Sequence, residues 1–573
     1  MEGFKGAGLA QPPPRRRRQL CICMASDFFF PSLGGIETHI YNLSQCLIQR
    51  GFKVVVITHY AKKRYGVRYL SNGLKVYYLP FLPVANNATL PTFFAFFPLI
   101  RNILLRERVD IVHGHQSTST LAHETLMIAR ALGMQVAYTD HSLFGFDDMA
   151  CIHLNKIVRF SLHDLDACIC VSHTHRENFV LRAGIHPSRV SVISNAVDAS
   201  TLVPDPAKRP QPPQVRVVVL SRLAYRKGID LLVTVIPPIC KKLPHVNFVI
   251  GGDGPKRIIL EEMREKHRLQ DRVELIGAVS HDKVGALLQS GHIFLNTSLT
   301  ESFCIAIVEA AACGMLVVST NVGGIPEVLP PHMVLLCDPD DLQVQRRLAE
   351  AVAMVHTVDP FRFHREILQR YSWHDVAARV ERVYFSLLFP ETKVYPPCSA
   401  SATPCLCGHS PLGPSEDDPR EAAHFCVCAR RTFWRDDARS ISLEGEEDVT
   451  SSPRVDTRSF YEDSLCACCD KPPLCCGCLE LPPSPPPLPS PFLVVQRLRK
   501  LYALGPVSGK IFCIVAIITW VYIRVLEFFY PSAEIEEVPA FPCDILLCLA
   551  EESGPEESEN LANSESASQD QLH

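Results

Sequence analysis

The hydrophobic positions of this chain fall into short apolar runs separated by longer segments of mixed polarity. Runs such as Cys21–Met24, Lys53–Thr58 and Val215–Leu220 are apolar at almost every position. Such runs are typical of strands buried on both faces of a parallel sheet, and the segments between them are long enough for helices. The alternation of strands and helices predicts an α/β fold built from doubly wound parallel sheets.

A proline-rich stretch interrupts this pattern. Prolines crowd residues 203–213, and a new series of apolar runs begins at Val215. Proline is disfavoured inside helices and strands, so this stretch predicts a boundary between two domains. We therefore predict Rossmann-like domains at 20–205 and 214–370, followed by an amphipathic closing helix at 371–390.

Polar side chains gather where strands of the first domain end. His113 and His115 lie at the end of the run 110–115, and His141 follows the run 135–139. Ligands of open α/β sheets bind outside the carboxyl ends of the strands. Each histidine could be a structural residue at a strand end, but the grouping of three favours a site.

A pair of glycines offers a candidate phosphate site in the same domain. Gly34 and Gly35 lie between the first strand and a helix expected from Thr38 to Arg50. Glycine lets backbone amides approach a ligand closely, and the start of a helix attracts anions. An ordinary tight turn would have the same pattern.

Positive charge follows the first strand of the second domain. Arg222 and Lys227 lie just after the run 215–220. A bidentate arginine and a point-charge lysine suit a diphosphate. Two solvated surface cations would give the same sequence.

Two glutamates lie further along the second domain. Glu301 and Glu309 are separated by small and apolar residues. A short helix starting near Ser302 would place both carboxylates on one ligand, with the amides of Ser302, Phe303 and Cys304 free to bind an anion. Alternatively, Glu301 only complements the helix dipole and Glu309 lies on a solvated face. The cations at a neighbouring strand end favour the ligand site.

Composition narrows the class of partners. The chain has 573 residues, a formal net charge of −4 and 24 cysteines. Without a basic excess, no nucleic acid partner is expected. The apolar run after Arg15–Arg18 is too short for a signal peptide, so we expect a disordered basic leader at 1–19 and a cytosolic body with reduced cysteines.

The C-terminal part of the chain has a different composition. Residues 391–500 are rich in cysteine and proline without a standard zinc spacing, and they predict a disordered insertion. The apolar stretch 508–530 predicts a transmembrane helix, with an interfacial helix as the alternative. Basic residues before it predict a cytosolic body, so the acidic disordered tail at 531–573 would be lumenal.

Together these motifs resemble retaining glycosyltransferases of the GT-B fold, family 4, over residues 20–390. Longer segments are similar to the family of catalytic A subunits of phosphatidylinositol N-acetylglucosaminyltransferases, the PIG-A type. The segments that carry this closer resemblance are Phe28–Glu37, Thr139–Phe146, Ser221–Leu223, Arg226–Leu232, Asn296–Glu301 and Val322–Pro330.

The resemblance implies transfer of N-acetylglucosamine from UDP-GlcNAc to phosphatidylinositol, the first step of glycosylphosphatidylinositol (GPI) anchor biosynthesis. It implies a single-pass protein of the endoplasmic reticulum membrane, with its active site on the cytosolic face and other subunits of a GPI-GlcNAc transferase complex as partners. A family-4 enzyme for another lipid acceptor, or a scaffold subunit without activity, would share the fold.

The resemblance also implies roles for individual residues. Glu301 would bind the transferred sugar, Glu309 the ribose, and Arg222 and Lys227 the diphosphate, while His141 would support the sugar or the acceptor. The full donor-binding set it implies is Gly34, Gly35, Arg222, Lys227, Glu301, Ser302, Phe303, Cys304 and Glu309. No cofactor or metal is expected, because arginine, lysine and helix amides would neutralise the leaving UDP.

Retention of configuration bears on the role of Glu301. A double displacement would need a carboxylate nucleophile. The family resemblance instead implies front-face transfer, so Glu301 is not expected to form a covalent adduct. Two positions depart from the family pattern: Cys304 stands where glycine is usual, and Ser194 stands where proline is common.

Overall fold

The computed structural model describes residues 19–538, apart from positions 33, 62–63, 86, 93, 147 and 164 and the segment 390–490. Nearly all of the predicted leader, most of the predicted insertion and the tail beyond residue 538 therefore lie outside the described residues.

The N-terminal domain is built on an eight-stranded sheet with the order β10-β9-β8-β7-β1-β2-β4-β3. Neighbouring strands are parallel except for the antiparallel edge pair β3–β4. Its strands are β1 Cys21–Ala25, β2 Lys53–His59, β3 Gly66–Tyr69, β4 Lys75–Leu79, β7 Ile111–His115, β8 Gln135–Asp140, β9 Ala167–Cys170 and β10 Val190–Val192. A separate hairpin pairs β5 Pro83–Ala85 with β6 Ala88–Thr89.

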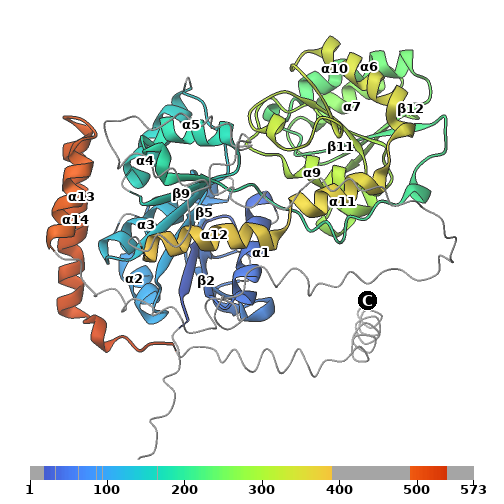
Figure 1. Ribbon diagram of the computed structural model, residues 1–573. Coiled ribbons are helices and arrows are strands. Elements are labelled where there is room, and N and C mark those ends of the chain that lie inside the picture. The colour runs from blue at the N-terminus through green and yellow to red at the C-terminus, as the bar shows by residue number, and fades with distance from the viewer. Residues whose placement is uncertain are drawn as a thin grey trace, which may run out of the picture.

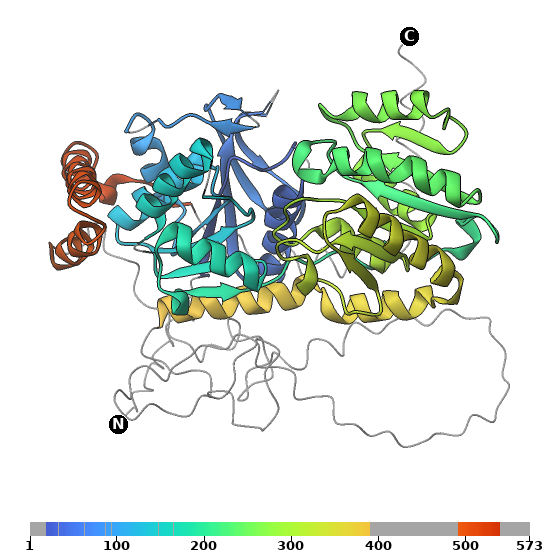
Figure 2. The same ribbon diagram turned by 90° about the horizontal axis from the view of Figure 1, so that it is seen from above.

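Helices cover both faces of this sheet (Figures 1 and 2). One apolar cluster includes side chains of α2 Phe97–Arg106, α3 Thr120–Ala131, α4 Met149–Leu162 and α5 His173–Ala183. The other includes side chains of α1 Gly35–Gln49 and α12 Trp373–Leu388. Because both faces are covered, successive strand residues are buried whichever way they point, which explains the continuous apolar runs.

The C-terminal domain has a six-stranded, fully parallel sheet with the order β13-β12-β11-β14-β15-β16. Its strands are β11 Val215–Leu220, β12 Val246–Gly251, β13 Val273–Gly277, β14 Ile293–Asn296, β15 Leu316–Thr320 and β16 Val334–Cys337. Its helices are α6 Ile229–Lys242, α7 Arg257–Lys266, α8 His281–Gln289, α9 Ile305–Ala312, α10 Asp341–Met354 and α11 Pro360–Arg370. The predicted α/β class with parallel sheets is confirmed.

The helix α12 returns from the C-terminal domain to the N-terminal domain (Figure 2). It packs against α1, and its Glu381 forms an ion pair with Arg50. The hydroxyl of Tyr384 lies 2.7 Å from Nδ1 of His113 at the end of β7. Since α12 follows α11 almost directly, it ties the two domains together.

Two further helices, α13 Pro491–Tyr502 and α14 Ser508–Phe529, pack against each other beside the N-terminal domain (Figure 1). The prediction that disorder extends to residue 500 is therefore wrong at this end. The physical reason is visible in the sequence: the proline-rich segment stops at Pro491, and proline is compatible with the first position of a helix.

The helix α14 is long and apolar enough to cross a membrane, by length and composition. One side of it contacts the N-terminal domain. The ring of Tyr522 lies 5.6 Å from that of Phe94, and Glu527 forms an ion pair with the buried Arg101. The other side exposes large apolar residues along most of its length: Ile511, Ile514, Ile517, Ile518, Val521, Val525, Phe528 and Phe529.

Candidate functional site

The strand order of each sheet reverses beside a central strand. In the N-terminal sheet β1 lies between β7 and β2, and in the C-terminal sheet β11 lies between β12 and β14. Loops that leave the carboxyl ends of strands at such a point form the usual ligand crevice of an open α/β sheet. Predicted site residues follow such strands: Gly34 and Gly35 lie at the start of α1 after β1, Arg222 and Lys227 lie after β11, and Glu301 lies after β14. His141 follows β8, two strands away from β1 in the sheet.

The ammonium group of Lys227 forms an ion pair with the carboxylate of Glu301. The same carboxylate oxygen accepts a hydrogen bond from Ser298 Oγ at 2.9 Å. Burial alone would lower the pKa of Lys227, but the charge of Glu301 outweighs it and raises that pKa, so Lys227 is cationic at neutral pH. An ammonium has three N–H donors, so Lys227 can bind an anion without releasing Glu301.

Two glycines hold the loops that carry this ion pair. Gly228 has a φ of 67°, and a Cβ there would lie 1.7 Å from the carbonyl oxygen of Thr297. Gly323 has a φ of 54°, and a Cβ there would lie 2.0 Å from the carbonyl oxygen of Glu301. Only glycine permits both the conformation and the approach, so these positions fix Lys227 and Glu301 relative to each other.

Arg222 and Glu309 are the other charged residues predicted for the donor site. Arg222 is exposed and forms no ion pair with any residue that the structure describes. Glu309 is half-buried on α9, and burial raises the pKa of its carboxyl group. Within the described parts of the chain its carboxylate has no hydrogen-bond donor, which leaves it free to bind hydroxyl groups.

The helix α9 begins later than predicted. It starts at Ile305, and its N-cap residue Cys304 has a φ of 68°. A helix cannot pass through this left-handed conformation, so the expected start near Ser302 is wrong. Left-handed backbone favours glycine, which accounts for glycine being usual in the family where this chain has Cys304.

The residues predicted to offer amides before α9 have separate roles. Phe303 is buried, and its ring lies 5.8 Å from that of Tyr371. Ser302 reaches the other domain, as described below. The amides of the first helical turn therefore begin at Ile305, not at Ser302.

The three histidines predicted at strand ends divide into two groups. His113 is fully buried, and its Nδ1 and Nε2 lie 2.7 Å from Tyr384 Oη and Thr139 Oγ1, respectively. Both ring nitrogens are therefore used inside the fold. This geometry favours the structural interpretation for His113.

His115 and His141 approach each other closely, with Nδ1 and Nε2 separated by 3.3 Å. His39 of α1 joins them, and the ring nitrogens of the three lie within 4.8 Å of one another. Burial lowers the pKa of all three, that of His39 to about 4. They are therefore neutral at pH 7, and can exchange hydrogen bonds with a sugar or hold a metal ion but supply no positive charge.

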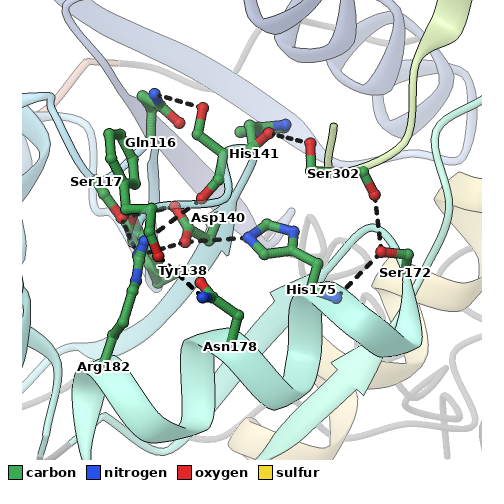
Figure 3. Close-up of polar contacts among 12 residues, drawn as sticks. Gln116, Ser117, Tyr138, Asp140, His141, Ser172, His175, Asn178, Arg182 and Ser302 are labelled. Carbon is green, nitrogen blue, oxygen red and sulfur yellow. Dashed lines mark hydrogen bonds and ion pairs between the residues drawn. The ribbon is translucent and has the colours of Figure 1, made fainter. Parts of the chain in front are cut away.

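A buried network around Asp140 positions the backbone of His141 (Figure 3). Asp140 accepts hydrogen bonds from Ser117 Oγ at 2.7 Å and from Arg182 at 2.8 Å, and it lies 3.2 Å from His175 Nε2. Burial alone would raise the pKa of Asp140, but Arg182 and His175 together hold it well below its usual range. The charge pair fixes the carboxyl end of β8.

Hydrogen bonds join the two domains beside His141 (Figure 3). Ser302 Oγ donates to the carbonyl oxygen of His141 at 2.5 Å, and Ser172 Oγ donates to the carbonyl oxygen of Ser302 at 2.7 Å. Nearby, a Cβ on Gly35 would lie 3.3 Å from Cδ1 of Ile305, so the loop after β1 approaches the start of α9. The segment that follows Glu301 thus contacts the parts of the N-terminal domain that carry His141 and Gly35.

Several contributors were not predicted from the sequence, among them His39, Arg182 and Glu327. His39 and Arg182 lie in helices whose patterns gave no sign that these polar residues are buried. Glu327 accepts hydrogen bonds from the N-terminal domain, including one from the backbone N–H of Thr174 at 2.8 Å. Its only signal was its place in the segment Val322–Pro330, which contributed to the family resemblance.

Two family models match this chain. One described as PIGA (GPI anchor biosynthesis) matches residues 59–148, and one described as Glycosyl transferases group 1 matches residues 205–354. The two matches fall on the N-terminal and C-terminal domains, respectively, with the second beginning in the proline-rich boundary.

Solved structures with similar folds are glycosyltransferases of the GT-B type. Sucrose-phosphate synthase from Thermosynechococcus elongatus has a TM-score of 0.56 at 19% identity, covering 65% of this chain and 100% of that one. Anabaena Alr3699/HepE in complex with UDP has a TM-score of 0.51 at 16% identity, covering 65% and 100%. At these identities the likeness shows the fold alone, and it confirms the predicted GT-B fold.

Curated relatives are much closer in sequence. Among the A subunits of phosphatidylinositol N-acetylglucosaminyltransferase, that of Arabidopsis thaliana is 54% identical over 376 residues, covering 66% of this chain and 83% of the relative. Its human counterpart is 52% identical, covering 64% and 76%, and the gpi3 subunit of Schizosaccharomyces pombe is 51% identical, covering 67% and 86%. Identity at this level over most of each relative, together with the shared fold, shows that the chain belongs to the family of phosphatidylinositol N-acetylglucosaminyltransferase A subunits.

Proposed function

We propose that this chain transfers N-acetylglucosamine from UDP-GlcNAc to phosphatidylinositol, the first step of GPI-anchor biosynthesis. The names of its relatives and the GPI-biosynthesis family model support the reaction. The observation that carries the proposal is the Lys227–Glu301 ion pair, which Ser302 links to His141 across the domain contact. In this proposal a cation, a carboxylate and a neutral imidazole act at one site where the two domains meet.

The charges of the C-terminal domain suit a nucleotide sugar. Lys227 has two further N–H groups for diphosphate oxygens, and the exposed Arg222 can bind them in a bidentate way. The amides at the start of α9 add partial positive charge without a titrating group. Glu309 would accept hydrogen bonds from the ribose hydroxyls, and Glu301 from the hydroxyls of the transferred sugar. Gly34 and Gly35 let the loop after β1 approach the donor.

The neutral histidine side suits the uncharged hydroxyl groups of the sugar and the acceptor. His141 can exchange hydrogen bonds with hydroxyls of the sugar or of the inositol ring without adding a charge. In front-face transfer the acceptor oxygen attacks the anomeric carbon while its proton passes to a leaving phosphate oxygen. Positioning and stabilisation of the leaving diphosphate then supply most of the catalysis, and Glu301 forms no covalent adduct.

No metal or cofactor is assigned a step in this reaction. The spacing of His39, His115 and His141 is compatible with a metal ion. The proposed chemistry does not require one, since Arg222, Lys227 and the α9 amides supply the positive charge that a diphosphate needs.

The enzyme acts in a membrane, as one subunit of a complex. We propose that α14 anchors it in the endoplasmic reticulum with the two domains on the cytosolic side and the C-terminus in the lumen. Basic residues on α13 and at the start of α14 support this orientation by the positive-inside rule. A glycosylation acceptor site fused after residue 573 should be modified in microsomes, and an unmodified site would contradict the lumenal placement.

The reaction is tested in microsomes from cells that lack the endogenous enzyme and express this chain. Labelled UDP-GlcNAc and phosphatidylinositol should give a labelled GlcNAc-lipid, and a strain without the chain supplies the background. Product from another nucleotide sugar or another lipid, with none from this pair, would favour a family-4 enzyme of different specificity. Full rescue of GPI-anchored surface proteins by a Lys227→Ala variant would contradict the assigned role of Lys227 in binding the diphosphate.

A further inference from the structure

One residue of the C-terminal domain is bound to the beginning of a helix in the N-terminal domain. Glu327 ends the 3₁₀ turn Ile325–Glu327, and its carboxylate lies at the first turn of α5. It accepts hydrogen bonds from the backbone N–H groups of His173 at 2.6 Å and Thr174 at 2.8 Å, and from Thr174 Oγ1 at 2.8 Å. We call this set of three hydrogen bonds the Glu327 latch.

The hydrogen bonds of the latch are charge-assisted, although Glu327 lies at the surface. Backbone N–H groups at a helix start have no partner inside the helix and carry partial positive charge, so a carboxylate satisfies them well. Hydrogen bonds to a charged group are about twice as strong as neutral ones. Glu327 itself is exposed and belongs to neither hydrophobic core. Its contacts with α5 therefore act on the arrangement of the domains, and each domain's own packing does not depend on them.

The latch connects directly to the backbone that carries Glu301. The N–H of Gly324 donates to the carbonyl oxygen of Glu301 at 2.9 Å. A Cβ on Gly324 would lie 2.2 Å from the carbonyl oxygen of Ser302 and 2.5 Å from Ser172 Oγ, so the segment has no room to shift. Any movement of α5 away from Glu327 would also move Ser172 away from Ser302. That would separate the loop of Glu301 from the N-terminal domain.

We propose that Glu327 is a positioning residue for sugar transfer, because its latch to α5 holds Glu301 and Lys227 against the His141 side of the crevice. The inference rests on the proposed transfer reaction and adds a residue that does not contact the reacting atoms. UDP is bound by the C-terminal domain in this scheme. Loss of the latch therefore slows the transfer step and leaves the affinity for UDP nearly unchanged.

Glu327→Gln, Thr174→Val and the double variant test this in the full-length chain within microsomes. Glu327→Gln should lower kcat about 10- to 100-fold, since it removes the charge from three hydrogen bonds. The inhibition constant of UDP should stay within about twofold of the unsubstituted chain, because charged contacts to the diphosphate remain. Thr174→Val removes one donor and should lower kcat by a smaller factor of about 3 to 10.

The double variant separates a shared contact from two unrelated effects. If both residues act through the latch, it should resemble Glu327→Gln alone and fall short of the product of the single effects. Glu350→Gln is the control, because Glu350 forms a solvent-exposed pair with Arg347 on α10. It should leave kcat unchanged.

Three results would overturn the latch. They are unchanged kcat in both single variants, multiplicative effects in the double variant, and losses that only follow the amount of assembled protein on an immunoblot. If Glu327→Gln fails to accumulate, the milder Thr174→Val carries the same comparison of kcat with UDP inhibition. Failure of the unsubstituted chain to form product would refute the transfer reaction itself, which is distinct from a latch without effect.

Discussion

The two sheet edges that meet at the crevice use opposite chemistry. On the N-terminal side, Asp140 and its partners are buried, and the histidines next to them are neutral. On the C-terminal side, Arg222 is exposed and Lys227 and Glu309 are only partly covered, so their charges are accessible to a ligand. One edge pairs its buried charges internally, through Asp140, Arg182 and His175, and the other keeps charge available for a ligand.

Under the proposed function, this difference lets one fold, used twice, serve two substrates. A nucleoside diphosphate needs exposed positive charge, while an inositol ring needs a rigid surface of neutral hydrogen-bonding groups. Breaking a buried polar network lowers the stability of the fold, whereas removing an exposed ligand-binding charge lowers activity. Substitutions on the two edges should therefore give different kinds of loss.

Lys227→Ala should give the largest loss of activity. Removing the cation that faces the leaving diphosphate is expected to lower kcat/KM about 100- to 1000-fold and to weaken inhibition by UDP. The chain should still accumulate and assemble. Lys208→Ala is a matched control, because Lys208 forms a solvent-exposed pair with Asp205 and is not among the proposed donor-binding residues. Equal losses in both variants, or none in Lys227→Ala, would contradict the assigned role.

Arg182→Met should mainly affect stability. It leaves Asp140 buried without its principal cation, which is expected to cost about 3–5 kcal/mol of unfolding free energy. The pKa of Asp140 is lowered in the folded chain, so its charge stabilises the fold above the unfolded pKa and this contribution is lost as pH falls through the folded pKa. The variant should lose that contribution.

Thermal unfolding of the detergent-solubilised chain, measured from neutral to acid pH, tests this expectation. Arg176→Met on the same helix is the control, since Arg176 donates one hydrogen bond to the carbonyl oxygen of Pro187 at 2.8 Å. A melting temperature for Arg182→Met close to that of the control would show that the buried edge tolerates an unpaired carboxylate.

The sequence predicted the charged edge better than the buried one. Arg222, Lys227 and Glu301 follow apolar strands closely in sequence, so the strand pattern places them at the carboxyl ends of the sheet, and the structure brings Lys227 and Glu301 together. Buried polar residues such as Arg182 and His39 have partners distant in sequence, so no local pattern marks them. Burial of a cation depends on the complete fold.

The fold was predictable because a strand buried on both faces of a sheet needs apolar residues at successive positions, which gives a continuous apolar run in the sequence. The start of α9 was not, since Cys304 adopts a left-handed backbone that the side chain disfavours. The helix at Pro491–Tyr502 was also missed, because the prolines before it suggested that the irregular composition continued.

Glu309→Gln should give an intermediate loss, about 10- to 100-fold in kcat/KM, because a charged acceptor of ribose hydroxyls becomes neutral. Burial raises the pKa of Glu309, so it gains its proton at a higher pH than an ordinary glutamate. The KM for the donor should therefore rise as pH falls through this raised pKa, and the variant should lack that rise. Glu262→Gln, on the exposed side of α7, should keep it. An identical acid profile in both variants would remove Glu309 from the donor site.

Ser302→Ala should give the smallest loss of activity, and it tests the contact between the two edges most directly. Ser302 donates to the carbonyl oxygen of His141, and a single neutral hydrogen bond is worth about 2- to 10-fold in an equilibrium. The control is Ser290→Ala, which removes a similar bond to the carbonyl oxygen of Leu287 within the C-terminal domain. If the edges are held together by several weak contacts, kcat should fall slightly in Ser302→Ala alone, with stability equal in both variants. A loss of activity as large as that of Lys227→Ala would instead mean that Ser302 contacts the reacting groups. A charged edge and a neutral edge would then not be enough to describe the site.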